Sequence, residues 1–226
     1  MSSASVTIRP GTPADLEAVA GLLTEVFLAD PLMGAIAGAA PDPRAALDHL
    51  HRVELTDRYL STDPARRAGA VVDLAVAAGA DGEERLLGVT LWDAPAVGGA
   101  GDPSGPLGPG DEPPAGLDLG LLGGAWDLVL TDGAQCEAAR PPEPHWYLHM
   151  VAVAARARGT GTGTALLRHG LERVDAQGVA AHLESTTPGS RRLYERLGFA
   201  LRTVLDHEPL PVYWAMTRAA RASGRG

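Results

Sequence analysis

The residues best suited to chemistry in this sequence form a glycine-rich turn, Arg158-Gly159-Thr160-Gly161-Thr162-Gly163. An apolar segment precedes it and an amphipathic one follows, which is typical of a strand leading into a helix. The first amides of a helix lack partners and lie at the positive end of its dipole. Glycines leave those amides open to an anion. Hydroxyl and guanidinium donors flank them: Thr160, Thr162, Thr164, Arg156 and Arg158. The pattern predicts a pyrophosphate-binding turn.

Other phosphate-binding motifs fit this turn less well. In a dinucleotide fingerprint the third glycine stands three residues after the second, whereas Gly163 follows Gly161 by two. A Walker loop needs a lysine, and all 19 basic residues of the chain are arginine. A purely structural turn stays open as an alternative, although three alternating glycines beside arginine favour anion binding.

The turn resembles the acetyl-CoA-binding motif of the GCN5-related N-acetyltransferases (GNAT). The family pattern of Arg or Gln, two residues, Gly, one residue, and Gly or Ala falls on Arg158, Gly161 and Gly163. A second frame also matches: Arg156, Gly159 and Gly161. The later segment Leu193-Tyr194-Glu195-Arg196-Leu197-Gly198-Phe199 resembles the closing motif of the same family.

The elements expected around these motifs follow the order of that family. The predicted strands are residues 5–9, 70–77, 85–92, 146–153, 179–185, 199–205 and 212–217. The predicted helices are one from Pro13 that stops at Asp30-Pro31, then residues 43–59, 117–138, 164–177 and 190–197. The resemblance is specific over 145–218, looser over 5–92 and absent from 93–144. We expect an α/β fold of the GNAT type, with a mixed sheet of about seven strands that is splayed between strands 4 and 5 and flanked by helices.

We expect residues 1–226 to form a single domain. Between the third and fourth strands, residues 93–116 contain seven Gly and six Pro, which predicts a surface excursion. Residues 219–226 are expected to be a disordered tail.

The resemblance implies that acetyl-CoA is the co-substrate and lies in the opening between strands 4 and 5. The Val151 and Val153 backbone would pair with its pantetheine amides, and the Val151 N–H would polarise the thioester carbonyl. Ser190 stands where the family often has Asn, so a hydroxyl would replace that amide. The expected contact residues are Met150, Val151, Val153, Arg158, Gly159, Thr160, Gly161, Thr162, Gly163, Thr164, Ser190 and Tyr194.

Transfer to an amine needs a base for the ammonium and an acid for the departing thiolate. The resemblance assigns the acid to Tyr194, and a core tyrosine is the alternative. His149 is one candidate base, predicted by a period of two to share a face with Tyr147, Val151 and Val153. A structural histidine is the alternative for His149.

Glu184 is the second candidate base, expected to share a face with His182. An exposed strand-end carboxylate is the alternative. Asp30 is expected either to line the substrate entrance or to cap a turn. Cys136 lies outside the motif region, so an acyl-cysteine route is not expected. No spacing of His, Asp or Cys indicates a metal site, and none is expected.

The composition limits the partners. A net charge of −9 argues against nucleic acid, and the chain has no run of apolar residues long enough to span a membrane. One cysteine allows no internal disulfide, which fits a reducing compartment, and Met1 to Arg9 lack an apolar signal core. We therefore expect a cytoplasmic protein with no nucleic-acid or membrane partner, and leave a homodimer open.

The sequence thus favours an acyl-CoA-dependent N-acyltransferase (EC 2.3.1 class). It would move an acetyl group from acetyl-CoA to a primary amine of a small molecule or peptide, by direct attack in a ternary complex. A non-catalytic acyl-CoA-binding or regulatory module and a nucleotide-binding protein are the alternatives. The choice of acceptor is expected to depend on the first two helices and on the segment before the fourth strand.

Overall fold

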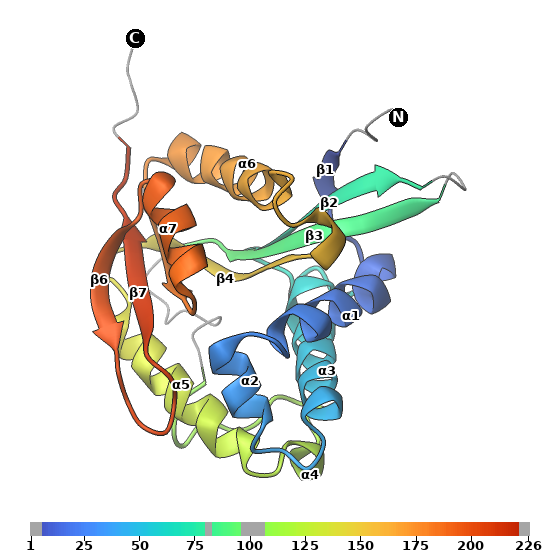
Figure 1. Ribbon diagram of the computed structural model, residues 1–226, viewed down its shortest axis with the longest axis vertical. Helices are drawn as coiled ribbons and strands as arrows, with labels where there is room; N and C mark the ends of the chain where they lie inside the picture. The colour runs from blue at the N-terminus through green and yellow to red at the C-terminus, as the bar shows by residue number, and fades with distance from the viewer. Residues whose placement is uncertain (1–5, 80–82, 96–106, 222–226) are drawn as a thin grey trace.

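The computed structural model describes residues 6–79, 83–95 and 107–221. Its centre is a seven-stranded mixed sheet in the order β1-β2-β3-β4-β5-β7-β6 (Figure 1). The strands are β1 (Thr7–Pro10), β2 (Ala70–Ala78), β3 (Glu84–Asp93), β4 (His145–Val153), β5 (Ala180–Ser185), β6 (Ala200–Leu205) and β7 (Tyr213–Arg218). All neighbours are antiparallel except β4 and β5. The expected fold is confirmed.

The parallel pair separates soon after it forms. Only three residues of β4 have partners in β5, and the last pair is Tyr147 with His182. From Leu148 onward, β4 keeps β3 on one side and leaves its β5 side open. The predicted splay between strands 4 and 5 is therefore present, and it begins at Tyr147.

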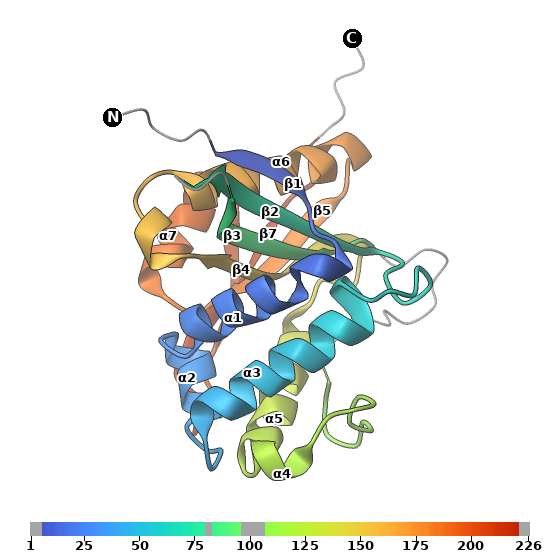
Figure 2. The same cartoon turned by 90° about the vertical axis from the view of Figure 1, so that its right-hand side faces the viewer.

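The part of the chain that the structure describes contains seven α-helices. They are α1 (Leu16–Phe27), α2 (Pro31–Ala37), α3 (Pro43–Glu54), α4 (Leu119–Leu122), α5 (Ala125–Ala139), α6 (Thr162–Gln177) and α7 (Pro188–Arg196). Short turns of other helix types are Pro13–Asp15, Leu55–Tyr59 and Ala155–Ala157. Helices α6 and α7 lie on one side of the sheet, and α1, α2, α3 and α5 on the other (Figures 1 and 2).

Two helix predictions need correction. Asp30-Pro31 ends α1, as expected, but it also begins the unpredicted helix α2, because Pro fits the first helical position and the Asp30 carboxylate caps the amides of Leu32 and Met33. The helix expected over 117–138 is two helices, since Gly123 adopts a φ of +51° between α4 and α5.

Some predictions fall outside the described residues. These are Ser5 at the start of the first strand, residues 80–82 between the second and third predicted strands, residues 96–106 of the excursion and residues 222–226 of the tail. No single described helix is long and apolar enough to cross a membrane. Pro13–Phe27 and Pro31–Ala37 would satisfy that test only as a pair, across a 98° bend.

The sheet and α6 meet with little spare space at Gly170. Trp92 of β3 is fully buried there, in a core that also contains Leu167 and Leu171 of α6. A Cβ on residue 170 would lie 2.5 Å from Trp92 Nε1. Glycine at this position lets the helix approach the indole ring.

We therefore expect Gly170→Ala to lower the melting temperature. Overpacking of a core costs roughly 1–3 kcal/mol, and each kcal/mol shifts Tm by about 2–4 °C in a domain of this size. The control is Gly21→Ala on the exposed side of α1, where a Cβ meets nothing within 4 Å. That control should be neutral or stabilising, because alanine is the better helix former. Equal melting temperatures for the two variants would contradict the prediction.

Candidate active site

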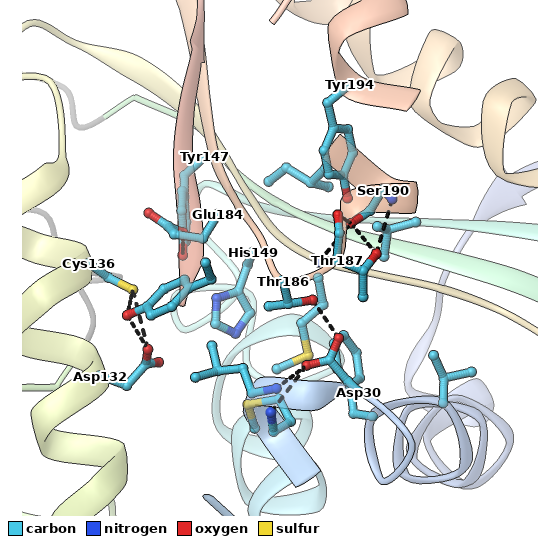
Figure 3. Close-up of a pocket in the computed structure, with 18 residues that line it drawn as sticks. Asp30, Asp132, Cys136, Tyr147, His149, Glu184, Thr186, Thr187, Ser190 and Tyr194 are labelled. Atoms are coloured by element: carbon cyan, nitrogen blue, oxygen red, sulfur yellow. Dashed lines mark hydrogen bonds between the residues drawn. The ribbon is translucent and has the colours of Figure 1, made fainter. Parts of the chain in front are cut away.

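A cavity of about 220 Å³ opens where β4 leaves β5. Its walls come from α1 and α2, from β4, from the end of β5 with α7, and from α5 with β7 (Figure 3). Seven of the lining residues carry the polar chemistry discussed below: Asp30, Asp132, Cys136, His149, Glu184, Ser190 and Tyr194. The cavity brings together all three predicted catalytic residues.

A β-bulge on β4 decides which way the central residues point. Leu91 pairs with Met150 and Trp92 with Leu148, so His149 has no partner in β3. The extra residue reverses the alternation of the strand. Leu148 and Val151 consequently pack in the core on the α6 side, whereas Met150 packs against the α1 side.

The prediction that Tyr147, His149, Val151 and Val153 share one face is therefore wrong. Tyr147 and His149 are neighbours, with ring centroids 5.8 Å apart. Val153 instead faces α6, where its side chain lies 3.2 Å from the position that a Cβ on Gly163 would take. A strict period of two fails because the bulge inserts one residue.

His149 forms an ion pair with a carboxylate on the neighbouring helix. Its Nε2 lies 2.5 Å from Glu54 Oε1, and its ring stacks on Tyr59 with centroids 5.6 Å apart. Burial lowers the pKa of His149, but the carboxylates of Glu54 and Asp93 outweigh burial and raise it above the usual value. The imidazole therefore holds its proton over more of the neutral range.

Glu184 is fixed by donors on both carboxylate oxygens. Tyr147 donates to Oε2 at 2.7 Å, and His182 Nε2 lies 3.0 Å from Oε1. The Glu184 side chain is only 8% exposed, so the exposed strand-end alternative is wrong. His182 shares its face of β5, as predicted, and its Nδ1 lies 3.0 Å from Thr217 Oγ1.

Tyr194 is buried at the α7 side of the cavity. Its ring packs edge-on against Phe199, with centroids 5.9 Å apart. Burial, and then the Asp30 charge, raise the pKa of its phenol. The phenol therefore stays protonated and able to donate, which suits the acid role predicted for it and equally a packing role.

Ser190 lines the cavity as part of the cap of α7. Its Oγ lies 2.8 Å from both Ser185 Oγ and Thr187 Oγ1, and Thr187 Oγ1 accepts from the Ser190 amide. Asp30 caps α2 and also lines the cavity, where its carboxylate accepts a hydrogen bond from Thr186 (Figure 3); whether a substrate enters beside it stays a prediction.

The glycine-rich turn connects β4 to α6, which starts at Thr162 rather than Thr164. Gly159 and Gly161 have φ of +77° and +91°, and a Cβ on either would meet nothing within 4 Å. Glycine there relieves the backbone of strain and keeps the approach to the helix start open. The first recorded donor back into the helix is the Ala165 amide, to the Gly161 carbonyl at 2.9 Å. Among the described residues, the amides of Thr162, Gly163 and Thr164 have no such partner, which leaves them open to an anion, whereas the Thr160 amide donates to the Ala157 carbonyl.

Some polar groups of the turn bond within the protein. Thr160 Oγ1 donates to the Ala157 carbonyl and lies 2.9 Å from Thr162 Oγ1. Arg158 Nε donates to the Val153 carbonyl at 3.3 Å, and Arg156 donates to the Leu86 carbonyl. Thr162 is buried, so its hydroxyl supports the turn from within.

The sequence does not predict the wall of the cavity that α5 and β7 form. Tyr213 donates to Asp132 Oδ1 at 2.6 Å, and the Cys136 thiol lies 3.8 Å from both groups. Asp132 and Cys136 stand at i and i+4 on α5, the one signal that they share a helix face. Cys136 thus lies in the cavity wall despite its distance from the motifs. Burial raises the pKa of its thiol well above the usual value, which makes it a poor nucleophile.

Comparisons with known proteins agree with this fold. The model of the acetyltransferase (GNAT) family matches residues 124–199. A solved structure described as histone acetyltransferase HPA2 and related acetyltransferase from Corynebacterium glutamicum is 27% identical, with a TM-score of 0.65, covering 97% of this chain and 99% of that chain.

Two further structures share the fold at lower identity. A mosquito arylalkylamine N-acetyltransferase like 5b is 18% identical (TM-score 0.63, 95% of this chain and 100% of that chain). A Drosophila melanogaster polyamine N-acetyltransferase, which forms N-acetylagmatine, is 17% identical (TM-score 0.60, 95% of this chain and 100% of that chain).

Asp132 yields a stability prediction. Burial raises its pKa to about 6, against the donation from Tyr213. When folding raises the pKa of a carboxyl, the folded state loses stability as the pH rises. The loss begins near the pKa of the unfolded state, about 3.9, and continues through the pKa of the folded state. Asp132→Asn keeps an acceptor for Tyr213 without the charge. We expect it to be more stable than wild type at pH 7.5, by about 1–3 kcal/mol.

Urea unfolding at several pH values tests this expectation, and the advantage of Asp132→Asn should vanish below about pH 4. Asp127→Asn, an exposed change on the same helix, is the control and should show no such trend. A difference between Asp132→Asn and wild type that is constant with pH would contradict the assignment.

Proposed function

We propose that this chain, which matches the acetyltransferase (GNAT) family model over residues 124–199 and shares the fold of solved acetyltransferases, transfers an acetyl group from acetyl-CoA to a primary amine of a small cationic molecule. One observation carries the proposal. The cavity at the β4–β5 separation brings an open strand edge together with a set of carboxylates and Tyr194, and the same strand leads on to the turn at the start of α6.

The donor would lie along the open edge of β4. Extended backbone at an unpaired edge can bond to an added strand-like ligand such as pantetheine. Met150 and Val151 line the cavity, and Val153 leads on to the turn. Beyond them, the amides at the start of α6 would hold the pyrophosphate, helped by the room that Gly159 and Gly161 leave.

The acceptor would enter on the side of the carboxylates. Asp30, Asp132 and Glu184 line the cavity, and no arginine is among its described lining residues. A cleft lined by one sign of charge attracts the opposite one. Two structures that share the fold are named for small amines, arylalkylamines and a polyamine, which is compatible with an acceptor of that class.

Chemistry would proceed by direct attack in a ternary complex. The ammonium loses a proton, its nitrogen bonds to the thioester carbonyl carbon, and the Val151 N–H stabilises the resulting oxyanion. We assign the proton to Glu184 rather than to His149, because His149 is paired with Glu54 and its pKa is raised. As the C–S bond breaks, Tyr194 would protonate the departing thiolate.

Release of free thiol from acetyl-CoA across a panel of amines tests the function. We expect turnover with small primary amines, and Tyr194→Phe should lower kcat by about 10- to 100-fold while the Kd for acetyl-CoA changes little. A parallel loss in kcat and in binding would make Tyr194 a packing residue. Binding of acetyl-CoA without thiol release from any amine would favour the non-catalytic module instead.

Substitution of Gly161 tests whether the glycine-rich turn binds acetyl-CoA. We expect Gly161→Val to weaken acetyl-CoA binding at least tenfold in calorimetry, since a side chain would both strain the positive φ and cover the helix start. Gly110→Val is the matched control, because Gly110 has a φ of +97° and similar open space but lies outside the turn between β4 and α6. Equal affinity in the two variants would mean that the turn is structural only.

A further inference from the structure

We propose that Asp132 forms a subsite for a second ammonium group, so that the acceptors this enzyme prefers are diamines rather than monoamines. The inference rests on the proposed function and assigns a role in it to helix α5. That helix belongs to the segment between β3 and β4, where the sequence shows no motif.

The Asp132 carboxylate can accept further hydrogen bonds from a group in the cavity. Its Oδ1 accepts from Tyr213 and lies near the Cys136 thiol. Among the described residues, no donor to Oδ2 is recorded, although Asp132 lines the cavity. A half-buried carboxylate that pairs only with neutral donors is left with uncompensated charge.

The other charged groups of the site already have partners. Asp30 holds two helix amides and Thr186, and Glu184 holds Tyr147 and His182. His149 pairs with Glu54 at the end of α3. Asp132 thus differs from the other two carboxylates in lacking a set of donors that occupies both oxygens.

Arg140 follows α5 at its C-terminal end, and its guanidinium is committed elsewhere. The Arg140 guanidinium lies over the Tyr147 ring at 4.1 Å and pairs with Glu137 at 3.6 Å, and it is not among the lining residues. An ammonium group of the ligand would supply the positively charged partner that Asp132 lacks. Its charge-assisted bond to Asp132 would be stronger than one from a neutral hydroxyl, and the ring of Tyr213 adds an aromatic surface that favours cations.

The arrangement separates two roles along the cavity. Figure 3 shows Asp132 and Cys136 at one end, Tyr194 and Ser190 at the other, with Glu184 and His149 between them. A diamine could place one nitrogen near Glu184, where it loses its proton, and the other at Asp132, where it keeps it. Apolar residues such as Leu32 and Met33 also line the cavity and suit an aliphatic chain.

Matched acceptors test the subsite. Diaminoalkanes of about three to six carbons are compared with n-alkylamines of the same lengths, by kcat/KM in thiol release. We expect the best diamine to exceed its monoamine by at least tenfold. Asp132→Asn should reduce that preference to less than about threefold, mainly by raising KM for the diamine. Asp127→Asn, on the same helix but exposed and outside the lining, should keep the wild-type preference.

Binding gives a readout that does not depend on turnover. The best diamine should raise the melting temperature of wild type and of Asp127→Asn, and should leave that of Asp132→Asn unchanged. A monoamine preference, or a diamine preference that survives in Asp132→Asn, would overturn the subsite and leave the proposed function standing. Bound acetyl-CoA without acetylation of either amine class would overturn the proposed function, and the subsite with it.

Discussion

The separation of β4 from β5 after Tyr147 is the feature on which the rest of the site depends. Parallel strands that stayed paired would satisfy each other's backbone groups and close the sheet at this point. Because pairing stops at Tyr147 and His182, the sheet opens instead. That opening exposes the strand edge expected to bind the donor and makes room for side chains from both faces.

The β-bulge at His149 works together with this opening. Ahead of the bulge, Leu148 packs under α6 and α7, and beyond it Met150 packs under α1. The side chains of β4 therefore change the face to which they point close to the residue where β4 stops pairing with β5. His149 is the extra residue of the bulge. Its position there explains how a residue of a central strand reaches Glu54 on α3.

Polar groups in the site are held mostly by other polar groups of the protein. Glu184 depends on Tyr147 and on His182, and Asp30 holds the start of α2 as well as Thr186. Such bonds offset the cost of keeping carboxylates away from water. Asp132 is the exception, because only neutral groups donate to it and only to Oδ1 among the described residues. A ligand that carries positive charge can compensate such a carboxylate in a cavity wall.

The sequence by itself determined the parts that depend on local chemistry. The spacing of Gly159 and Gly161 indicated the strand-to-helix turn, because backbone conformation there is a property of the glycines themselves. The apolar periodicity marked most strands and helices, and the motif around Tyr194 located the closing helix. Helix α2 was missed, since Asp30-Pro31 can end one helix and begin the next, and propensity alone does not say which.

Only the tertiary structure decided which side chains meet. The bulge at His149 has no sequence signature, because it arises from the register between two strands that lie far apart in the chain. The burial of Glu184 depends on Tyr147 of the neighbouring strand. Asp132 reaches the cavity because α5 packs against β6 and β7, which no local pattern foretells. Local propensities thus established the turn, and long-range packing established the acceptor side of the site.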